Sequence, residues 1–153
     1  MTQFFYTLII FASFGGFFLA TYIRHRKSSN EKLICLIGSD CDSVVHSEYS
    51  YFLGLPVEIL GLVYYGLIGI SYGVFVSMPG LVSPSVLLIV LAFSAIAVLF
   101  SIYLTFIQIW ILKQLCTWCL ISAGLCVLIF IFALVGSEHS IADLLRFYDG
   151  LIV

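Results

Sequence analysis

The chain has 153 residues, of which 63% are hydrophobic and only 9% are charged, and its mean hydropathy is +1.21. A water-soluble globule of this size needs more polar surface than this composition supplies, so the sequence predicts an integral membrane protein. The formal net charge of -2 provides no basic field for a polyanion, which excludes nucleic acid as a partner.

Four apolar stretches are long enough to cross a bilayer as helices, since a hydrocarbon core of about 30 Å requires roughly 20 residues. They are residues 4–23, 57–76, 86–112 and 116–135. The first stretch has no cationic start and no clear cleavage site, so we expect a retained anchor and no removable signal peptide. The predicted fold class is an all-α membrane protein, a single domain over residues 1–153 built as a four-transmembrane-helix bundle.

The connection between the first two stretches, residues 24–55, is the only one with enough polar residues to hold structure outside the lipid. Apolar residues recur in it at helical spacing, which predicts an amphipathic cap helix lying over the mouth of the bundle. These residues are Val45, Tyr49, Phe52 and Leu53. A loop helix that rests on lipid headgroups is the alternative.

Two further polar positions lie at the edges of the predicted spans. Glu58 follows Pro56 at the start of the second span, where it suits the positive end of a helix, so we interpret it as structural. A proton-carrying role is the alternative for an ionisable group at membrane depth. The third stretch is longer than a bilayer requires, and we expect its end to carry Gln108 and Trp110 toward the headgroups.

The motif Cys116-Thr-Trp-Cys119 opens the fourth stretch. Residues three apart share a helix face, so the two sulfurs can form a disulfide, and the helix N-terminus favours the reactive thiolate. Structural zinc sites use the same spacing, and with Cys35 and Cys41 the motif could supply four thiolates. A redox enzyme, a zinc-binding protein and a structural subunit with one static disulfide clamp are therefore all open.

The depth of the cysteines favours a redox relay. Cys119 lies further into the fourth stretch than Cys116, where a lipid-soluble quinone could reach it. Electrons would pass from an external dithiol through the loop pair, Cys35 and then Cys41, to the motif, and from Cys119 to the quinone. Cys126 lies inside the same stretch and is interpreted as a small buried hydrophobic residue.

These residues together resemble the vitamin K epoxide reductase family, and the likeness covers nearly the whole chain. It consists of a loop cysteine pair, a serine, a Gly-Pro helix start and a CxxC motif that opens the fourth span, here Cys35 and Cys41, Ser47, residues 54–56, and Cys116 with Cys119. The order and spacing of these features make the likeness specific.

The resemblance implies a thiol:quinone oxidoreductase that supports disulfide bond formation by oxidising a thioredoxin-like protein, with ubiquinone or menaquinone as electron acceptor. It implies Cys116 and Cys119 as the active-site pair, with Cys119 meeting the quinone. It also implies Cys35 and Cys41 as the shuttle, and Ser47 as a serine near the quinone.

The chain also departs from its relatives. Ala123 stands downstream of the CxxC motif where vertebrate members use a tyrosine to hold vitamin K, so epoxide reduction is not expected. The chain ends too soon for a fused thioredoxin-like domain, so we expect a separate partner protein and a monomeric enzyme.

The family habit places the cysteines on the exterior or periplasmic side of the cell membrane, which we expect here. The positive-inside rule would favour the cytoplasm, because the cysteine loop carries Arg24, Arg26, Lys27 and Lys32.

Overall fold

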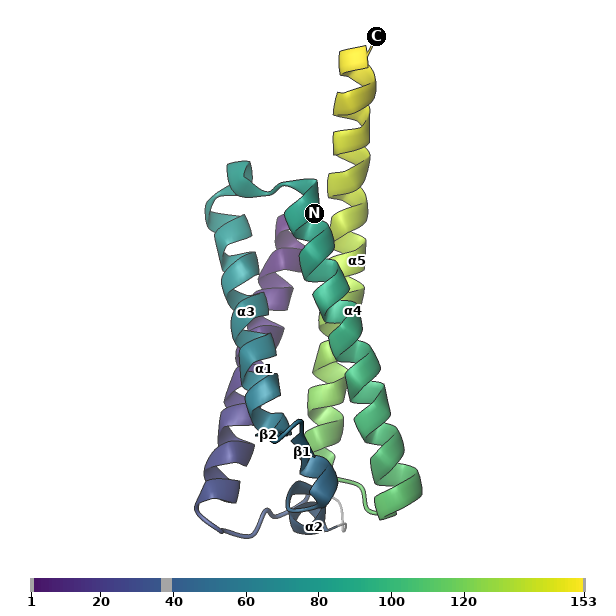
Figure 1. The fold of residues 1–153 in the computed structure, drawn as a ribbon. Coiled ribbons are helices and arrows are strands. Elements are labelled where there is room, and N and C mark those ends of the chain that lie inside the picture. Colours follow the sequence, from purple (N-terminus) through teal and green to yellow (C-terminus); the bar gives the residue numbers. More distant parts are fainter. Residues whose placement is uncertain (1, 37–39, 153) are drawn as a thin grey trace.

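The computed structural model describes residues 2–36 and 40–152, except for the side chains of residues 139–141, 143–145, 147–148 and 151–152. Its long helices run side by side along one axis and form an elongated bundle (Figure 1). They are α1 (Thr2–Ser28), α3 (Val57–Ser77), α4 (Pro84–Ile107) and α5 (Thr117–Ile152). Within the described chain, four helices are long and apolar enough to span a membrane, which confirms the predicted all-α membrane class.

Two of these helices extend beyond the predicted spans. Helix α1 continues to Ser28, and α5 continues through the C-terminal tail to Ile152, so that its last turns project beyond the rest of the bundle (Figure 1). Hydropathy marks the part of a helix that suits lipid, and it does not mark the end of the backbone hydrogen-bond pattern. The predicted spans were therefore shorter than the helices that contain them.

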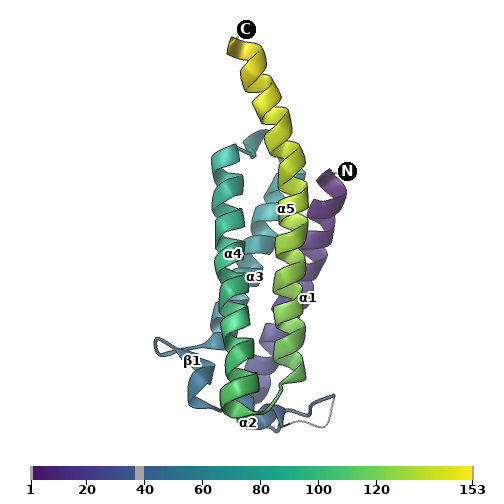
Figure 2. The same ribbon diagram turned by 90° about the vertical axis from the view of Figure 1, so that its right-hand side faces the viewer.

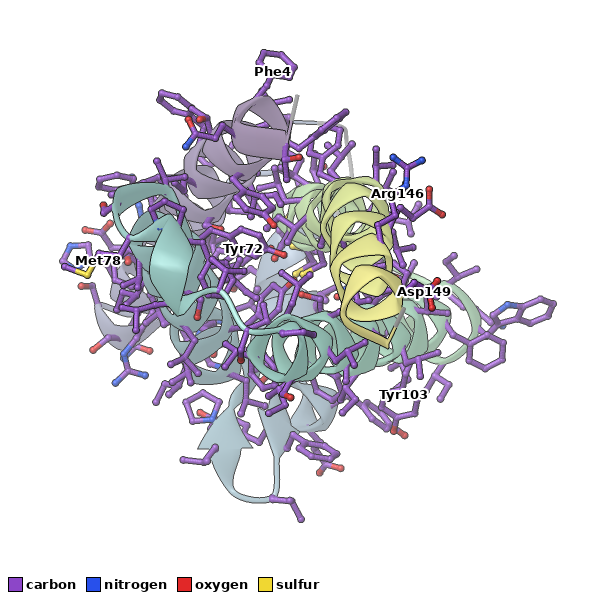
Figure 3. All side chains as sticks on the ribbon, turned by 90° about the horizontal axis from the view of Figure 1, so that it is seen from above. Phe4, Tyr72, Met78, Tyr103, Arg146 and Asp149 are labelled. Carbon is purple, nitrogen blue, oxygen red and sulfur yellow. A yellow bond between two sulfur atoms is a disulfide. The ribbon has the colours of Figure 1, made fainter. Side chains whose placement is uncertain are left out.

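The bundle interior is rich in aromatic side chains. Helix α1 packs against both α3 and α5, whereas α4 packs chiefly against α5. Tyr72 lies inside the ring of helices, while Phe4, Met78 and Tyr103 project outward, as the view along the bundle shows (Figure 3). Outward-facing apolar side chains of this kind are what a lipid-exposed surface requires.

The connection from α1 to α3 is compact and mostly not helical. It contains α2 (Cys41–Val45), the short 3-10 helix η1 (Glu48–Ser50) and the paired strands β1 (Tyr51–Phe52) and β2 (Leu55–Pro56). The hairpin projects sideways from the base of the bundle (Figure 2).

The predicted cap helix through residue 53 is therefore wrong, although the short α2 does lie at the bundle mouth. Ser47 is extended at ψ 159, which ends the helical pattern, and Leu53 and Gly54 have positive φ values of 52 and 81. Two such residues make the turn of a tight hairpin, and the proline that follows disfavours helix in the residue before it. The apolar spacing suits a helix, but these turn residues decide the backbone.

Helix α4 ends in a π-helical turn, η3 (Gln108–Leu112), which is capped by Lys113 in the left-handed region at φ 51. A π turn inserts an extra residue into the helical repeat and rotates the side chains around it. The short stretch that follows leads directly into α5, so that η3 and the start of α5 lie beside each other at the base of the bundle.

Candidate functional site

Both cysteine pairs lie at the same end of the bundle, where α1 and η3 end and where α3 and α5 begin (Figure 1). Cys41 and Cys116 are each 0% exposed and belong to one cluster of buried side chains. Cys35 and Cys119 pack against the same cluster. The fold therefore brings together the four cysteines that the sequence singled out, although they come from segments far apart in the chain.

The outer pair forms a disulfide. Cys35 and Cys41 are joined with their Cα atoms 5.6 Å apart, within the range that a disulfide needs. Cys41 is the first residue of α2, and Asp40 is the N-cap of this helix. The Asp40 side chain accepts a 3.3 Å hydrogen bond from the Ser43 amide. Cys35 is partly exposed and Cys41 is fully buried, so Cys35 is the more accessible residue of this disulfide.

The loop that carries the outer disulfide is held over the start of α5 by a few contacts. The indole Nε1 of Trp118 donates a 3.1 Å hydrogen bond to the carbonyl of Ile34, and the Trp118 ring lies 5.3 Å from that of Tyr22. The Asp40 amide donates to Oε1 of Gln114 at 3.4 Å, which is long for a hydrogen bond. Such contacts position the loop without locking it.

The inner pair, Cys116 and Cys119, is in the thiol form. Cys116 immediately precedes α5, and its carbonyl accepts a 3.0 Å hydrogen bond from the Leu120 amide. The pKa of Cys116 is lowered chiefly by a hydrogen bond from the Cys119 thiol, and further by the amides of Cys119 and Trp118, while burial opposes the shift. Cys116 therefore ionises more readily than an ordinary cysteine, as expected at a helix start.

Gln108 is a buried polar residue of this site, at the end of the stretch that the sequence carries toward the headgroups. It is 5% exposed, whereas Trp110 is 68% exposed, so only Trp110 faces outward. Its Oε1 accepts a 3.4 Å hydrogen bond from the Cys116 amide, and its side chain also contacts the Cys119 thiol. The π turn of η3 directs Gln108 toward α5. In the sequence, the feature that could have marked Gln108 as a site residue is that it is an amide within an apolar stretch.

An apolar cavity of about 560 Å³ lies beside the inner pair, which is within the size range of small-molecule sites. It is bounded by α3, α4, α5 and the loop before α3, and Cys119 lines it, whereas Cys116 is not among its described lining residues. Aromatic rings contribute much of the wall, namely those of Phe52, Tyr64, Phe93 and Phe100. The cavity can hold a flat apolar molecule against one sulfur of the pair.

Ser47 also lines this cavity. Its hydroxyl donates a 2.7 Å hydrogen bond to the carbonyl of Val44, so its oxygen can still accept or share a further bond. The resemblance implied a serine near the electron acceptor, and the structure puts Ser47 on the cavity wall. Its role there stays a prediction.

A buried ion pair adjoins the cavity, and its carboxylate residue, Glu58, is part of the cavity wall. Lys27, from the last turn of α1, donates from Nζ to Oε1 of Glu58 at 3.1 Å and to the Ser50 hydroxyl at 3.0 Å. The side chains of Lys27 and Glu58 are only 10% and 7% exposed. The sequence interpretation treated Lys27 as a topology signal, because nothing local shows that it meets a residue 31 positions later.

Cys126 lies on the cavity wall deeper in the bundle. The Tyr65 hydroxyl lies 3.3 Å from its sulfur, donates to the Ser122 carbonyl at 2.8 Å and lies 2.9 Å from the Ser122 hydroxyl. Cys126 is buried, as the sequence predicted, and it also takes part in a polar cluster that the sequence did not predict.

The zinc alternative can be compared with the same geometry. Among the side chains that the structure describes, no group of three or more His, Cys, Asp or Glu is arranged to hold a metal ion. The disulfide also occupies two of the four sulfurs that an all-thiolate site would use.

Comparison with known proteins identifies a family. A family model described as the vitamin K epoxide reductase family matches residues 7–134, which is most of the chain and includes both cysteine pairs. A search of curated proteins found no significant match.

Proposed function

Because the chain belongs to the vitamin K epoxide reductase family, we propose that it is a membrane thiol:quinone oxidoreductase that supports disulfide bond formation. In this proposal a thioredoxin-like protein is oxidised, and ubiquinone or menaquinone is reduced. One observation carries the proposal: two cysteine pairs meet at one end of the bundle, and a sulfur of the inner pair lines an apolar cavity.

The outer pair accepts electrons from the partner. A partner thiolate attacks Cys35, the more exposed sulfur, so that a mixed disulfide forms and Cys41 leaves as a thiolate. The second partner thiol then attacks the mixed disulfide and releases Cys35. The partner departs with a new disulfide, and the outer pair has gained two electrons and two protons.

The inner pair is reduced next. Cys41 attacks the inner disulfide at Cys116, with which it shares the buried cluster, and Cys119 leaves. Attack of Cys35 on the new bond between Cys41 and Cys116 restores the outer disulfide. An outer disulfide beside an inner dithiol, as in this structure, is the state that this step would leave.

Quinone reduction completes the cycle. Cys119 lines the cavity, so we propose that it is the sulfur that meets the quinone. Cys116 accepts the hydrogen bond of the Cys119 thiol, which suits it to draw off that proton as Cys119 reacts. The two sulfurs form a disulfide, and the quinone takes up two electrons and two protons to become a quinol.

The cavity suits the quinone as substrate. Rings such as Phe93 and Phe100 can pack against its face. Ser47 is the proposed hydrogen-bond donor to one of its oxygens, for which its hydroxyl must turn from the Val44 carbonyl toward the quinone. We further propose a monomer that works with a separate thioredoxin-like protein on the exterior face of the cell membrane. The positive-inside rule counted Lys27 among the cations that favour the cytoplasm. Its buried pairing with Glu58 gives Lys27 a structural reason for its position.

Turnover with purified protein tests the proposal. In lipid nanodiscs, with ubiquinone or menaquinone and a reduced thioredoxin-like protein, the chain should form quinol and oxidised partner in equal amounts. Cys119→Ser should abolish quinol formation, because the cavity then lacks its reactive sulfur. Cys126→Ser removes a thiol from the same helix but leaves the CxxC motif, and should still reduce quinone. Quinol formation by Cys119→Ser at the wild-type rate would refute the proposed route.

Trapping in the host identifies the partner. In Cys41→Ala the lone Cys35 thiolate can attack the disulfide of the oxidised partner, so that one partner sulfur leaves as a thiolate. The outer pair then has no second sulfur to resolve the mixed disulfide, which should accumulate and be recoverable for mass spectrometry. The compartment in which the trapped protein resides then tests the exterior orientation.

A further inference from the structure

Glu58 has a feature that its ion pair does not explain. Its Oε1 atom is bonded to Lys27, but Oε2 is buried, and no hydrogen-bond partner lies within reach among the described residues. A buried carboxylate oxygen without a partner is unfavourable and calls for an explanation. Because Glu58 lines the cavity, a ligand bound there is the available partner.

The surroundings hold Glu58 in place on the cavity wall. Lys27 is fixed by Ser50 and lies 4.3 Å from the centre of the Tyr51 ring, so it anchors one oxygen of the carboxylate. Glu58 and Cys119 both line the cavity. An anchored carboxylate on the wall of the cavity that also holds the electron-donating sulfur is well placed to exchange protons with a molecule bound there.

Quinone reduction creates a need for such a group. The two carbonyl oxygens of a para-quinone point in opposite directions, so a sulfur pair on one wall cannot deliver a proton directly to both. Besides Glu58, the described titratable groups on the cavity wall are tyrosine hydroxyls and thiols, namely Tyr49, Tyr64, Tyr65, Cys119 and Cys126. Among the described residues, Glu58 is thus the only carboxyl group on the cavity wall.

Building on the function proposed above, we infer that Glu58 is the proton-transfer residue for quinone reduction. Glu58 takes up one of the two thiol protons at Oε2 and passes it to one oxygen of the quinone as Cys116 and Cys119 deliver two electrons and join as a disulfide. The other thiol proton goes to the other quinone oxygen. The sum is dithiol plus quinone giving disulfide plus quinol, with Glu58 unchanged.

Single-turnover kinetics test this role. Wild type and variants are fully reduced, mixed with a short-chain quinone in nanodiscs, and followed by quinol absorbance at several pH values. Glu58→Gln should slow quinone reduction on the order of 100-fold, the usual size of a general acid contribution, with little change in KM for the quinone. Its reaction with a reduced thioredoxin-like protein should be unchanged. Glu58→Asp should recover part of the rate, and Glu48→Gln, which removes an exposed carboxylate from the same loop, should behave as wild type.

A double variant separates proton transfer from mere anchoring of Lys27. If Glu58 only neutralises Lys27, Glu58→Gln is slow because it leaves a buried cation unpaired, and adding Lys27→Met should restore the rate. If Glu58 carries the proton, the double variant stays slow and lacks the wild-type pH dependence of the quinone step. Recovery in the double variant, or an unchanged rate in Glu58→Gln, would overturn the inference alone. Wild-type protein that exchanges thiols but reduces no quinone would refute the proposed function and this inference with it.

Discussion

Trp118→Phe should loosen the loop that carries the outer disulfide. Trp118 links that loop to α5 through its indole N–H, which donates to the Ile34 carbonyl at 3.1 Å, and its ring lies 5.3 Å from that of Tyr22. Phenylalanine keeps an aromatic ring against Tyr22 but cannot donate the hydrogen bond. The substitution therefore removes one tether and leaves the cavity wall unchanged, because Trp118 is not among the described lining residues.

The size of the effect follows from the tether. A net hydrogen bond contributes about 0.5–1.5 kcal/mol, which corresponds to a change of roughly twofold to tenfold in an equilibrium constant. The next contact between these segments, from the Asp40 amide to Gln114, is 3.4 Å long and cannot compensate fully. We expect the loop of Trp118→Phe to open about fivefold more often than in wild type.

Reduction of the outer disulfide by a small thiol reports this opening, because Cys35, the residue that the thiol attacks, is only partly exposed while the loop is closed. The rate, followed by alkylation and mass spectrometry, should rise about fivefold in Trp118→Phe. Trp110→Phe changes the other tryptophan, which lies outside the loop and is 68% exposed, and should leave the rate unchanged. Equal rates in wild type and Trp118→Phe would show that this hydrogen bond does not hold the loop.

Two predictions concern packing and ionisation. Gly16→Ala would press a methyl group onto the buried ring of Tyr65 and should lower stability by about 1–3 kcal/mol, seen as a lower thermal midpoint. Gly15→Ala is the control, since within the described structure its new carbon would meet nothing within 4 Å, and an equal loss there would contradict the packing argument. The pKa of Cys116 is lowered chiefly by the hydrogen bond from Cys119, so ionisation of Cys116 stabilises the reduced fold. This stabilisation is fully present above the ordinary pKa of a thiol, and it is lost as the pH falls through the lowered pKa of Cys116. Denaturant unfolding of the reduced protein across this window should show the dependence, and Cys116→Ser should remove it.

The spans and the cysteine motif were predictable because both depend on neighbouring residues. About 20 consecutive apolar residues are long enough to cross lipid, however the helix packs in the bundle. The structure has α3 at Val57–Ser77, within one residue of the predicted range. A CxxC motif at the start of such a helix has its two sulfurs on one face for the same local reason. The connection before α3 was harder, because Leu53 and Gly54 turn the chain at positive φ although the apolar spacing suits a helix.

By itself, the sequence determined that this is a membrane protein with four spans, a loop cysteine pair and a CxxC motif at a helix start, since composition, hydropathy and spacing are local properties of the chain. Only the tertiary structure decided which polar groups share the cavity with Cys119. Lys27 reaches Glu58 across 31 positions because α1 packs on α3, and Gln108 reaches Cys116 because η3 turns it toward α5. Contacts between separate helices depend on how the helices pack and rotate, and no local pattern in a single sequence records that rotation.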